Sequence, residues 1–482
     1  MFVDTSYNVL LWALFPLIAL VSFSFLWHKQ CCNKEKRKLP PGAMGFPFIG
    51  ETKEFFNAQS RNQLFEEFVQ PRIQKHGKIF KTRIMGSPTV VVNGAEANKF
   101  ILSNEFKLVK SSWPYSTVQL MGSESIMEKD SDKHRYLRGV IGTTLGYAGL
   151  EVLVPKICSS VQLYLATNWK GEENVSLYRS TKVLTFRIVF ECLLGINVEQ
   201  GMLDTFERVL EGVFSPAIMF PGSKFWRAKK ARVEIEKMLT KVVKEKKKEM
   251  EMEGNLLREK DGIMLLSKLV QGMMQGEISE KEVIDNVVLL VFAAHDTTSF
   301  AIAMTFKMLG QYPHCYSKLL QEHVEIMNNK KHGENLTMDD IKKMKYTWQV
   351  ARESMRMFPP IFGSFRKAIT DIEYEGLTIP KGWKVLWTTY GTHYNEEYFK
   401  DPLSFNPSRF EEAITPYAFV PFGGGPRLCA GYQLAKLNIL IFVHYVVTQY
   451  HWFLLHPEEP VTMDPLPYPS LGMPIKISSK YA

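Results

Sequence analysis

Residues 421–431 read Pro421-Phe422-Gly423-Gly424-Gly425-Pro426-Arg427-Leu428-Cys429-Ala430-Gly431. The glycines allow positive φ angles and a close approach of the backbone to a flat group. The apolar run that follows predicts a helix from near Gly431 to about Tyr450. Cys429 would then lie at the N-terminus of a helix, where backbone N–H groups and the positive end of the helix dipole stabilise a thiolate. Arg427, two residues earlier, could pair with an anionic group beside the sulfur.

Two ordinary interpretations of this stretch compete with a thiolate loop. A phosphate-binding loop would need a suitable preceding strand and a Lys-Ser/Thr ending, and this stretch has neither. A lone cysteine is most often a buried, inert thiol. The combination of five residues favours a ligand loop instead: Phe422, Gly425, Arg427, Cys429 and Gly431.

The pattern F-x-x-G-x-R-x-C-x-G in this stretch resembles the haem-binding loop of the cytochrome P-450 superfamily. A proline-rich elbow, an oxygen-binding helix and an E-x-x-R helix precede it, in the order and spacing of that family. The resemblance implies that Cys429 is the axial ligand of the iron of haem b, and that Arg427 pairs with a haem propionate. It also implies cofactor contacts from Phe422, Gly425 and Gly431. A thiolate ligand pushes electron density to the iron and favours O–O cleavage.

The apolar run Val287–Thr298 is interrupted by an acid and hydroxyls. A charged group inside such a run needs a reason, and a local cap or helix bend is the alternative explanation. The run resembles the family's A-G-x-D/E-T-T segment, in which acid and threonine relay protons during oxygen activation. The resemblance therefore implies catalytic roles for Asp296, the proton source, and Thr297. Ala294 departs from the usual glycine, which could narrow the groove over the iron.

Glu353 and Arg356 are three residues apart and share a helix face. Alone this is a weak signal, because exposed pairs at this spacing are common and contribute little. With the Phe-Pro-Pro sequence at 358–360 and the Asn-Pro-Ser-Arg-Phe sequence at 406–410, it resembles the structural triad of the family. The resemblance implies that Glu353, Arg356 and Arg409 lock the core behind the haem and serve folding and haem retention.

His134 and Arg138 are four residues apart on another predicted helix. They match the spacing at which the family places an aromatic residue or His and an Arg against a haem propionate. The resemblance implies that both bind the cofactor, and that His134 is a propionate donor and not a metal ligand. A solvent-facing pair is the alternative.

The segment from Val9 to Trp27 contains no charged side chain. Roughly 20 apolar residues at about 1.5 Å each cross a hydrocarbon core of about 30 Å. A basic cluster follows the run at residues 29–38, which predicts a cytosolic body by the positive-inside rule. A cleaved secretory signal would instead need its basic region before the run. The spacing of the cysteines does not suggest disulfide pairs, as expected in a reducing compartment. Palmitoylation of Cys31 or Cys32 stays open.

We expect a transmembrane anchor at 1–28, a basic and proline-rich hinge at 29–50, and a single large catalytic domain at 51–482. Helical periodicity dominates residues 130–357, with loops near 221–222 and 328–336. Short β-rich runs at Ile79–Ile84 and Thr89–Val92 predict a hairpin turning at Gly86-Ser-Pro88. The fold class is therefore mainly α with a small β-rich lobe, and the resemblance implies the cytochrome P-450 fold. The net charge of +9 comes without a basic and aromatic module, so no nucleic-acid partner is expected.

The resemblance also indicates a substrate pocket, whose proposed lining is Trp113, Phe292, Ala293, Ile361 and Leu471. Segments at 39–42, 50–52, 292–298 and 469–475 resemble plant enzymes that oxidise cyclic triterpenes such as β-amyrin, with taxoid hydroxylases nearby. The function this implies is that of a haem-thiolate monooxygenase that hydroxylates or further oxidises such a triterpene with O2. A diterpenoid, taxoid or sterol hydroxylase is the first alternative.

Two other classes are weighed against a monooxygenase. A haem-thiolate isomerase or dehydratase needs no O2, but such enzymes often lose the acid–alcohol pair that is present here. A haem sensor or carrier would need no proton relay. No G-x-G-x-x-G strand–turn–helix for a flavin or nicotinamide is found, so electrons should come from NADPH through a separate membrane-bound reductase. We expect a monomer in the endoplasmic reticulum membrane.

Overall fold

The computed structural model describes residues 21–22, 38–252, 264–331, 333–464 and 466–481. Apart from residues 21–22, the predicted transmembrane run lies outside the described residues. So do Cys31, Cys32 and residues 29–37 of the predicted hinge.

The described helices are as follows: α2 (Thr52–Ser60), η1 (Phe65–Val69), α3 (Gln70–His76), α4 (Ala95–Ser103), α5 (Tyr115–Met121), α6 (Ser131–Leu145), α7 (Tyr147–Asn168), α8 (Leu177–Arg187), η2 (Ile188–Leu194), α9 (Met202–Leu210), α10 (Lys224–Met252), α11 (Leu265–Met274), α12 (Glu280–Gln311), α13 (Pro313–Asn328), α14 (Met338–Lys343), α15 (Lys345–Met357), α16 (Tyr390–His393), η4 (Pro407–Phe410), η5 (Gly425–Arg427) and α17 (Tyr432–Gln449).

The described strands are β1 (Ile79–Ile84), β2 (Ser87–Val92), β3 (Val109–Ser111), β4 (Asn174–Ser176), β5 (Gly363–Ala368), β6 (Ile372–Tyr374), β7 (Leu377–Ile379), β8 (Lys384–Thr388), β9 (Tyr450–Leu454), β10 (Val461–Met463), β11 (Pro467–Pro469) and β12 (Pro474–Ser479).

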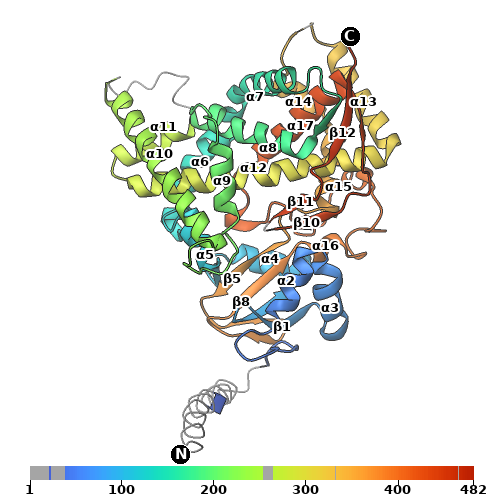
Figure 1. Ribbon diagram of the computed structural model, residues 1–482. Helices are drawn as coiled ribbons and strands as arrows, with labels where there is room; N and C mark the ends of the chain where they lie inside the picture. Colours follow the sequence, from blue (N-terminus) through green and yellow to red (C-terminus); the bar gives the residue numbers. More distant parts are fainter. Residues whose placement is uncertain (1–20, 23–37, 253–263, 332, 465, 482) are drawn as a thin grey trace, which may run out of the picture.

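The prediction of a mainly α fold with a small β-rich lobe is confirmed. A helical body surrounds the long helix α12, and a five-stranded sheet in the order β1-β2-β8-β5-β3 lies beside α2, α3 and α4 at one end (Figure 1). In this sheet β2 and β8 are parallel and the other pairs are antiparallel. Smaller sheets join β4, β12 and β9, β10 and β11, and β6 and β7.

The predicted hairpin is present, but its turn lies earlier than expected. Met85 and Gly86 have φ angles of 51° and 70° and make the turn, whereas Ser87 and Pro88 already belong to β2. Pairing of β2 with β8 begins only at Thr89. Pro88 therefore needs no N–H for that neighbour, which is where a proline is tolerated in a strand.

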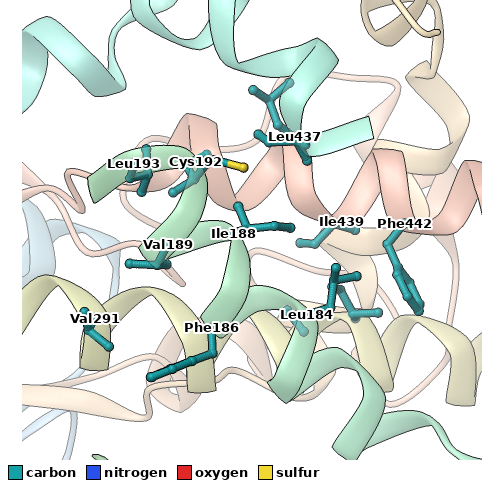
Figure 2. Close-up of a cluster of buried hydrophobic side chains, with 14 of the residues drawn as sticks. Leu184, Phe186, Ile188, Val189, Cys192, Leu193, Val291, Leu437, Ile439 and Phe442 are labelled. Carbon is teal, nitrogen blue, oxygen red and sulfur yellow. The ribbon is translucent and has the colours of Figure 1, made fainter. Parts of the chain in front are cut away.

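Helix α12 forms the core of the helical body. Ser279 caps its start by a capping box, in which the Ser279 hydroxyl accepts from the Glu282 N–H at 3.1 Å. The helix is long and apolar enough to cross a membrane, but most of its surface is buried within the protein. Helices that are apolar on all sides are expected in such a core. Figure 2 shows Val291 in a cluster of buried apolar side chains that also includes residues of α8, η2 and α17.

Two connections were not expected from periodicity. Strand β4, which lies inside the segment expected to be helical, pairs with β12 near the C-terminus. Part of the predicted hinge packs on β1, because the Lys81 N–H donates to Pro41 O at 2.7 Å. Glu51, the first residue after the hinge, is also bonded to β1, since its N–H donates to Arg83 O at 2.9 Å. A three-residue strand and a distant partner leave no local pattern in the sequence.

Candidate active site

One face in the middle of α12 is accessible although the helix is otherwise largely buried. Ala293 is exposed, and Ala294 and Thr297 are half-buried. Their spacing of one and four residues places them on the same side of the helix. Phe292, which was expected in the substrate pocket, is only 4% exposed and packs against Phe206, with ring centroids 5.4 Å apart.

The carboxylate of Asp296 is buried and ion-paired. Its Oδ1 lies 3.0 Å from Nζ of Lys182 on α8, and Lys182 also contacts Glu207 at 2.7 Å. Burial alone would lower the pKa of Lys182, but the charges of Asp296 and Glu207 raise it above the ordinary value. Lys182 is therefore a cation at neutral pH and a partner for the Asp296 carboxylate.

The second oxygen of Asp296 has no such partner. Within the described chain, Asp296 Oδ2 and both ring nitrogens of His295 are buried without a hydrogen bond. His295 Nδ1 lies 3.4 Å from this oxygen, and burial lowers the pKa of His295. Thr297 lies next in the helix, and its hydroxyl donates to Ala293 O at 2.7 Å. A carboxylate oxygen and a hydroxyl that can accept a proton thus lie beside the accessible face.

The loop at 421–431 presents Cys429 to its surroundings. Of the cysteines in the described residues, Cys158, Cys192 and Cys315 are buried and Cys429 is exposed. The Cys429 N–H donates to Phe422 O at 2.9 Å. The Phe422 ring packs edge-on against the Tyr432 ring, with ring centroids 4.7 Å apart. Surrounding protein atoms raise the pKa of the thiol, while the Gly431 amide and the charge of Arg138 act to lower it. The predicted helix follows as α17.

Gly425 allows the cysteine loop to pack closely against the backbone of α4. Its φ is +66°, and a Cβ there would lie 2.0 Å from the Leu102 carbonyl oxygen of α4. A side chain at this position would force the loop away from α4. Gly431 is less constrained, since a Cβ there would be 3.9 Å from the sulfur of Cys429.

Arg427 is held by protein acceptors. Its Nε donates to Glu105 at 2.7 Å, and its terminal nitrogens donate to the carbonyls of Ile126, Met127 and Lys129. The other oxygen of Glu105 accepts from Nε of Arg366 at 2.6 Å. A buried carboxylate therefore bridges two arginines, one of them two residues from Cys429.

His134 and Arg138 of α6 lie near this cluster. His134 is buried against Phe106, with ring centroids 5.2 Å apart. Burial, with the charges of Arg427 and Arg138, lowers its pKa to about 4, so the imidazole is neutral at pH 7. Arg138 is half-buried and makes no hydrogen bond or ion pair with any described residue, although its charge acts on Cys429.

Glu353, Arg356 and Arg409 come together behind the loop. Glu353 accepts from Nε of Arg356 at 2.8 Å and from Nε of Arg409 at 3.0 Å, and Glu353 and Arg356 are fully buried. His393 extends this cluster, because its Nδ1 lies 3.1 Å from Arg356 O and its Nε2 accepts from the Val420 N–H at 3.1 Å. The cluster is thus hydrogen-bonded, through His393, to Val420, the residue that precedes the cysteine loop.

Comparison with known proteins identifies the family. The model named Cytochrome P450 matches residues 40–478. The chain belongs to the cytochrome P450 family. It is 41% identical to taxoid 2-alpha-hydroxylase of Taxus canadensis (93% of this chain, 92% of the relative) and 39% identical to taxane 13-alpha-hydroxylase of Taxus cuspidata (92% of each). It is also 36% identical to beta-amyrin 28-monooxygenase of Medicago truncatula (98% of this chain, 99% of the relative).

A solved structure confirms the P450 fold. Retinoic acid-bound cyanobacterial CYP120A1 matches with a TM-score of 0.82 at 29% identity, covering 92% of this chain and 100% of that one. The protein is therefore a P450 monooxygenase, an oxidoreductase that uses haem, O2 and electrons from a reductase.

The residues around Cys429 fit the haem of a P450. Cys429 offers an accessible sulfur, and the nearby Arg138 offers a half-buried guanidinium with no hydrogen bond or ion pair to a described residue. A flat anionic group with a metal centre would use both, because buried charges normally have partners.

Four functional candidates had no signal in the sequence: Glu105, Lys182, Arg366 and His393. Each meets its partner only in the folded chain, as Lys182 meets Asp296 across 114 positions. The other pocket candidates differ in exposure: Ile361 is half-buried, and Leu471 is 58% exposed.

Proposed function

We propose that this P450 oxidises a cyclic triterpene such as β-amyrin, by hydroxylation or further oxidation. The observation that carries the proposal is the accessible Ala293–Thr297 face of α12, which adjoins the paired Asp296 carboxylate. A relative with β-amyrin in its name, 36% identical over almost its whole length, supports this substrate class.

The proposed roles of the residues follow from their positions. Cys429 ligates the iron of haem b, which when bound supplies the centre for oxygen activation. His134 and Arg138 donate to its anionic edge, and Trp113 lines the substrate pocket. Arg427, which is bonded to Glu105, holds the loop in place and contributes positive charge.

Asp296 and Thr297 handle the protons in this proposal. Lys182 fixes Oδ1 of Asp296 by an ion pair and leaves Oδ2 free to accept a proton from solvent and pass it on. Thr297 can accept through its hydroxyl oxygen while donating to Ala293 O. The presence of this pair argues against an isomerase or dehydratase that needs no O2.

The proposed setting is the cytosolic face of the endoplasmic reticulum membrane, with residues 1–28 as anchor and 29–50 as hinge to the 51–482 domain. The protein would be a monomer, and NADPH would supply electrons through a separate membrane-bound reductase. The charge-free run from Val9 to Trp27 and the basic residues after it support this arrangement.

A taxoid or other diterpenoid is the second candidate substrate class. The observation in its favour is the 41% identity to taxoid 2-alpha-hydroxylase, against 36% to the β-amyrin enzyme. Fold does not decide between them, because substrate choice is determined by a few pocket contacts.

The test is co-expression with a plant NADPH-dependent reductase, followed by incubation with β-amyrin or with a taxane diterpene. We expect an oxygenated β-amyrin that carries label from ¹⁸O₂. Oxygenation of the taxane alone would replace the triterpene proposal with the second candidate. Conversion of either substrate without label would contradict monooxygenation.

A further inference from the structure

The turn between β11 and β12 carries an exposed apolar side chain. Leu471 is 58% exposed, whereas Met473, two residues later, is 3% exposed. Gly472 between them has a φ of +78°, and a Cβ there would lie 2.8 Å from the hydroxyl of Ser176. The turn at 470–473 is therefore packed tightly, with Leu471 pointing away from the core.

The first turn of α8 holds one side of this turn. Gly472 O accepts from the Ser176 hydroxyl at 2.7 Å and from the Tyr178 N–H at 3.1 Å, and Met473 O accepts from the Leu177 N–H at 3.0 Å. These bonds tie the backbone of the turn to a helix that packs along α12.

Tyr178 also connects the turn to the catalytic acid. Nζ of Lys182 lies 5.7 Å from the centroid of the Tyr178 ring and 3.0 Å from Oδ1 of Asp296. Burial, and then the charge of Asp296, raise the pKa of the Tyr178 phenol, which agrees with this closeness. The turn that carries Leu471 is thus linked to the proposed proton-handling residue Asp296 through Tyr178 and Lys182.

Glu459 holds the other side of the turn. Oε1 of its carboxylate accepts from the Leu471 N–H. The Met473 N–H donates to both carboxylate oxygens, at 3.1 Å to Oε2 and 3.3 Å to Oε1. Glu459 is 5% exposed. Lys307 of α12 donates to Pro457 O at 2.5 Å and to Glu459 O at 3.0 Å, which attaches this segment to α12 as well.

The energetics make Glu459 the decisive member of this clamp. Hydrogen bonds from backbone N–H groups to a carboxylate are charge-assisted and stronger than neutral ones. A turn whose tip is an exposed leucine has few apolar contacts of its own to fix it. Without the carboxylate, the N–H groups of Leu471 and Met473 would lose their acceptor.

We propose that Glu459 is a positioning residue for substrate specificity. Its carboxylate holds Leu471 at a fixed distance from Asp296 and Thr297, so that Leu471 packs on the lipophilic substrate and determines which carbon is oxidised. Glu459 itself touches no substrate. This inference rests on the proposed function and adds a specificity determinant to it.

The first test compares Glu459→Gln with Glu458→Gln, an exposed neighbour in the same segment. With β-amyrin as substrate, we expect E459Q to change the ratio of oxidised products by roughly tenfold at unchanged haem content. E458Q should match the wild type. Leu471→Ala should shift the products in the same way, and the double variant should go no further. A wild-type product ratio in E459Q would overturn the proposal.

A second readout separates this inference from the proposed function. If the wild type oxidises neither β-amyrin nor a taxane, the proposed function fails, but the clamp can still be measured by amide hydrogen exchange. We expect the amides of Leu471 and Met473 to exchange roughly tenfold faster in E459Q than in E458Q, and equal rates would overturn the clamp. If E459Q does not incorporate haem, Leu471→Ala decides the specificity role, and an unchanged product ratio there would overturn it.

Discussion

At Asp296 the electrostatics depend on one neighbouring cation. Nζ of Lys182 lies 3.0 Å from Oδ1 of Asp296, and its second carboxylate partner, Glu207, is more exposed than Asp296. Removing one partner of a buried ion pair leaves the other charge uncompensated. Without Lys182, the Asp296 carboxylate would lose the cation that fixes Oδ1 and would no longer be held in place for the proposed relay.

We therefore expect Lys182→Met to slow product formation by roughly tenfold or more at unchanged haem content, because relay groups typically contribute at least that much. The measurement is the turnover rate together with product formed per NADPH oxidised. Arg179→Met is the matched control, since Arg179 lies on the same helix and pairs with Glu207 at the surface. Equal rates for the two variants would contradict a role for the Lys182–Asp296 pair.

His393 should make the P450 sensitive to acid. Burial, and then the charge of Arg356, lower its pKa from 6.5 to about 3. A histidine with a depressed folded pKa contributes stability that is complete above pH 6.5 and is lost as the pH falls toward 3. This loss amounts to about 1.4 kcal/mol per pH unit for one proton.

His393→Gln removes this titration, so the melting temperature of the variant should depend less on pH between 6.5 and 4 than that of the wild type. The same change at the exposed His451 is the control, and its pH profile should match the wild type. Parallel profiles for H393Q and the wild type would show that His393 does not titrate in this way.

At the scale of elements, α10, α12 and the segment after α5 meet at a buried ion pair. Arg232 of α10 contacts Asp285 of α12 at 2.5 Å and donates to Leu120 O at 3.0 Å. The other oxygen of Asp285 accepts from the Glu124 N–H at 3.0 Å. One carboxylate thus orients a long helix and the segment that leads to Ile126, whose carbonyl binds Arg427.

Asp285→Asn should therefore destabilise the protein by about 3–5 kcal/mol, the usual cost of removing one partner of a buried pair. The measurement is thermal unfolding of the haem-loaded protein, together with the rate of haem loss. Asp132→Asn breaks an exposed pair with Arg135 and should leave both quantities unchanged. Similar stabilities for the two variants would contradict the importance of the buried pair.

Elements with a strong local signal could be predicted. The β1–β2 hairpin has runs rich in β-branched residues on both sides of Gly86, and α17 has a long, mostly apolar run. Strand β4 could not be predicted, because a three-residue strand has no period and its partner is 300 positions away (Val175 pairs with Ile475). Of two neighbours proposed for the pocket, Ala293 is exposed, whereas Phe292 packs against Phe206 in the core, and an apolar helical run does not distinguish the two.

For the whole molecule, the family could be predicted because the loop around Cys429 must satisfy several geometric demands at once and the other motifs precede it in the family's order. The cluster of Glu353, Arg356 and Arg409 could also be predicted, since Glu353 and Arg356 are only three residues apart on one helix. The carboxylate that bridges Arg366 and Arg427 could not, because its partners are 261 and 322 positions from Glu105. Long-range ion pairs depend on the completed fold and not on any sequence window.

The central claim is that Cys429 ligates the haem iron, and the most direct measurement is the absorption spectrum of the reduced protein under carbon monoxide. The account predicts a red-shifted, thiolate-type Soret band for the wild type and for Cys192→Ser, which alters a buried cysteine. Haem-loaded Cys429→His should lack that band. A folded, haem-loaded wild type without the shifted band, or its retention in Cys429→His, would contradict the account.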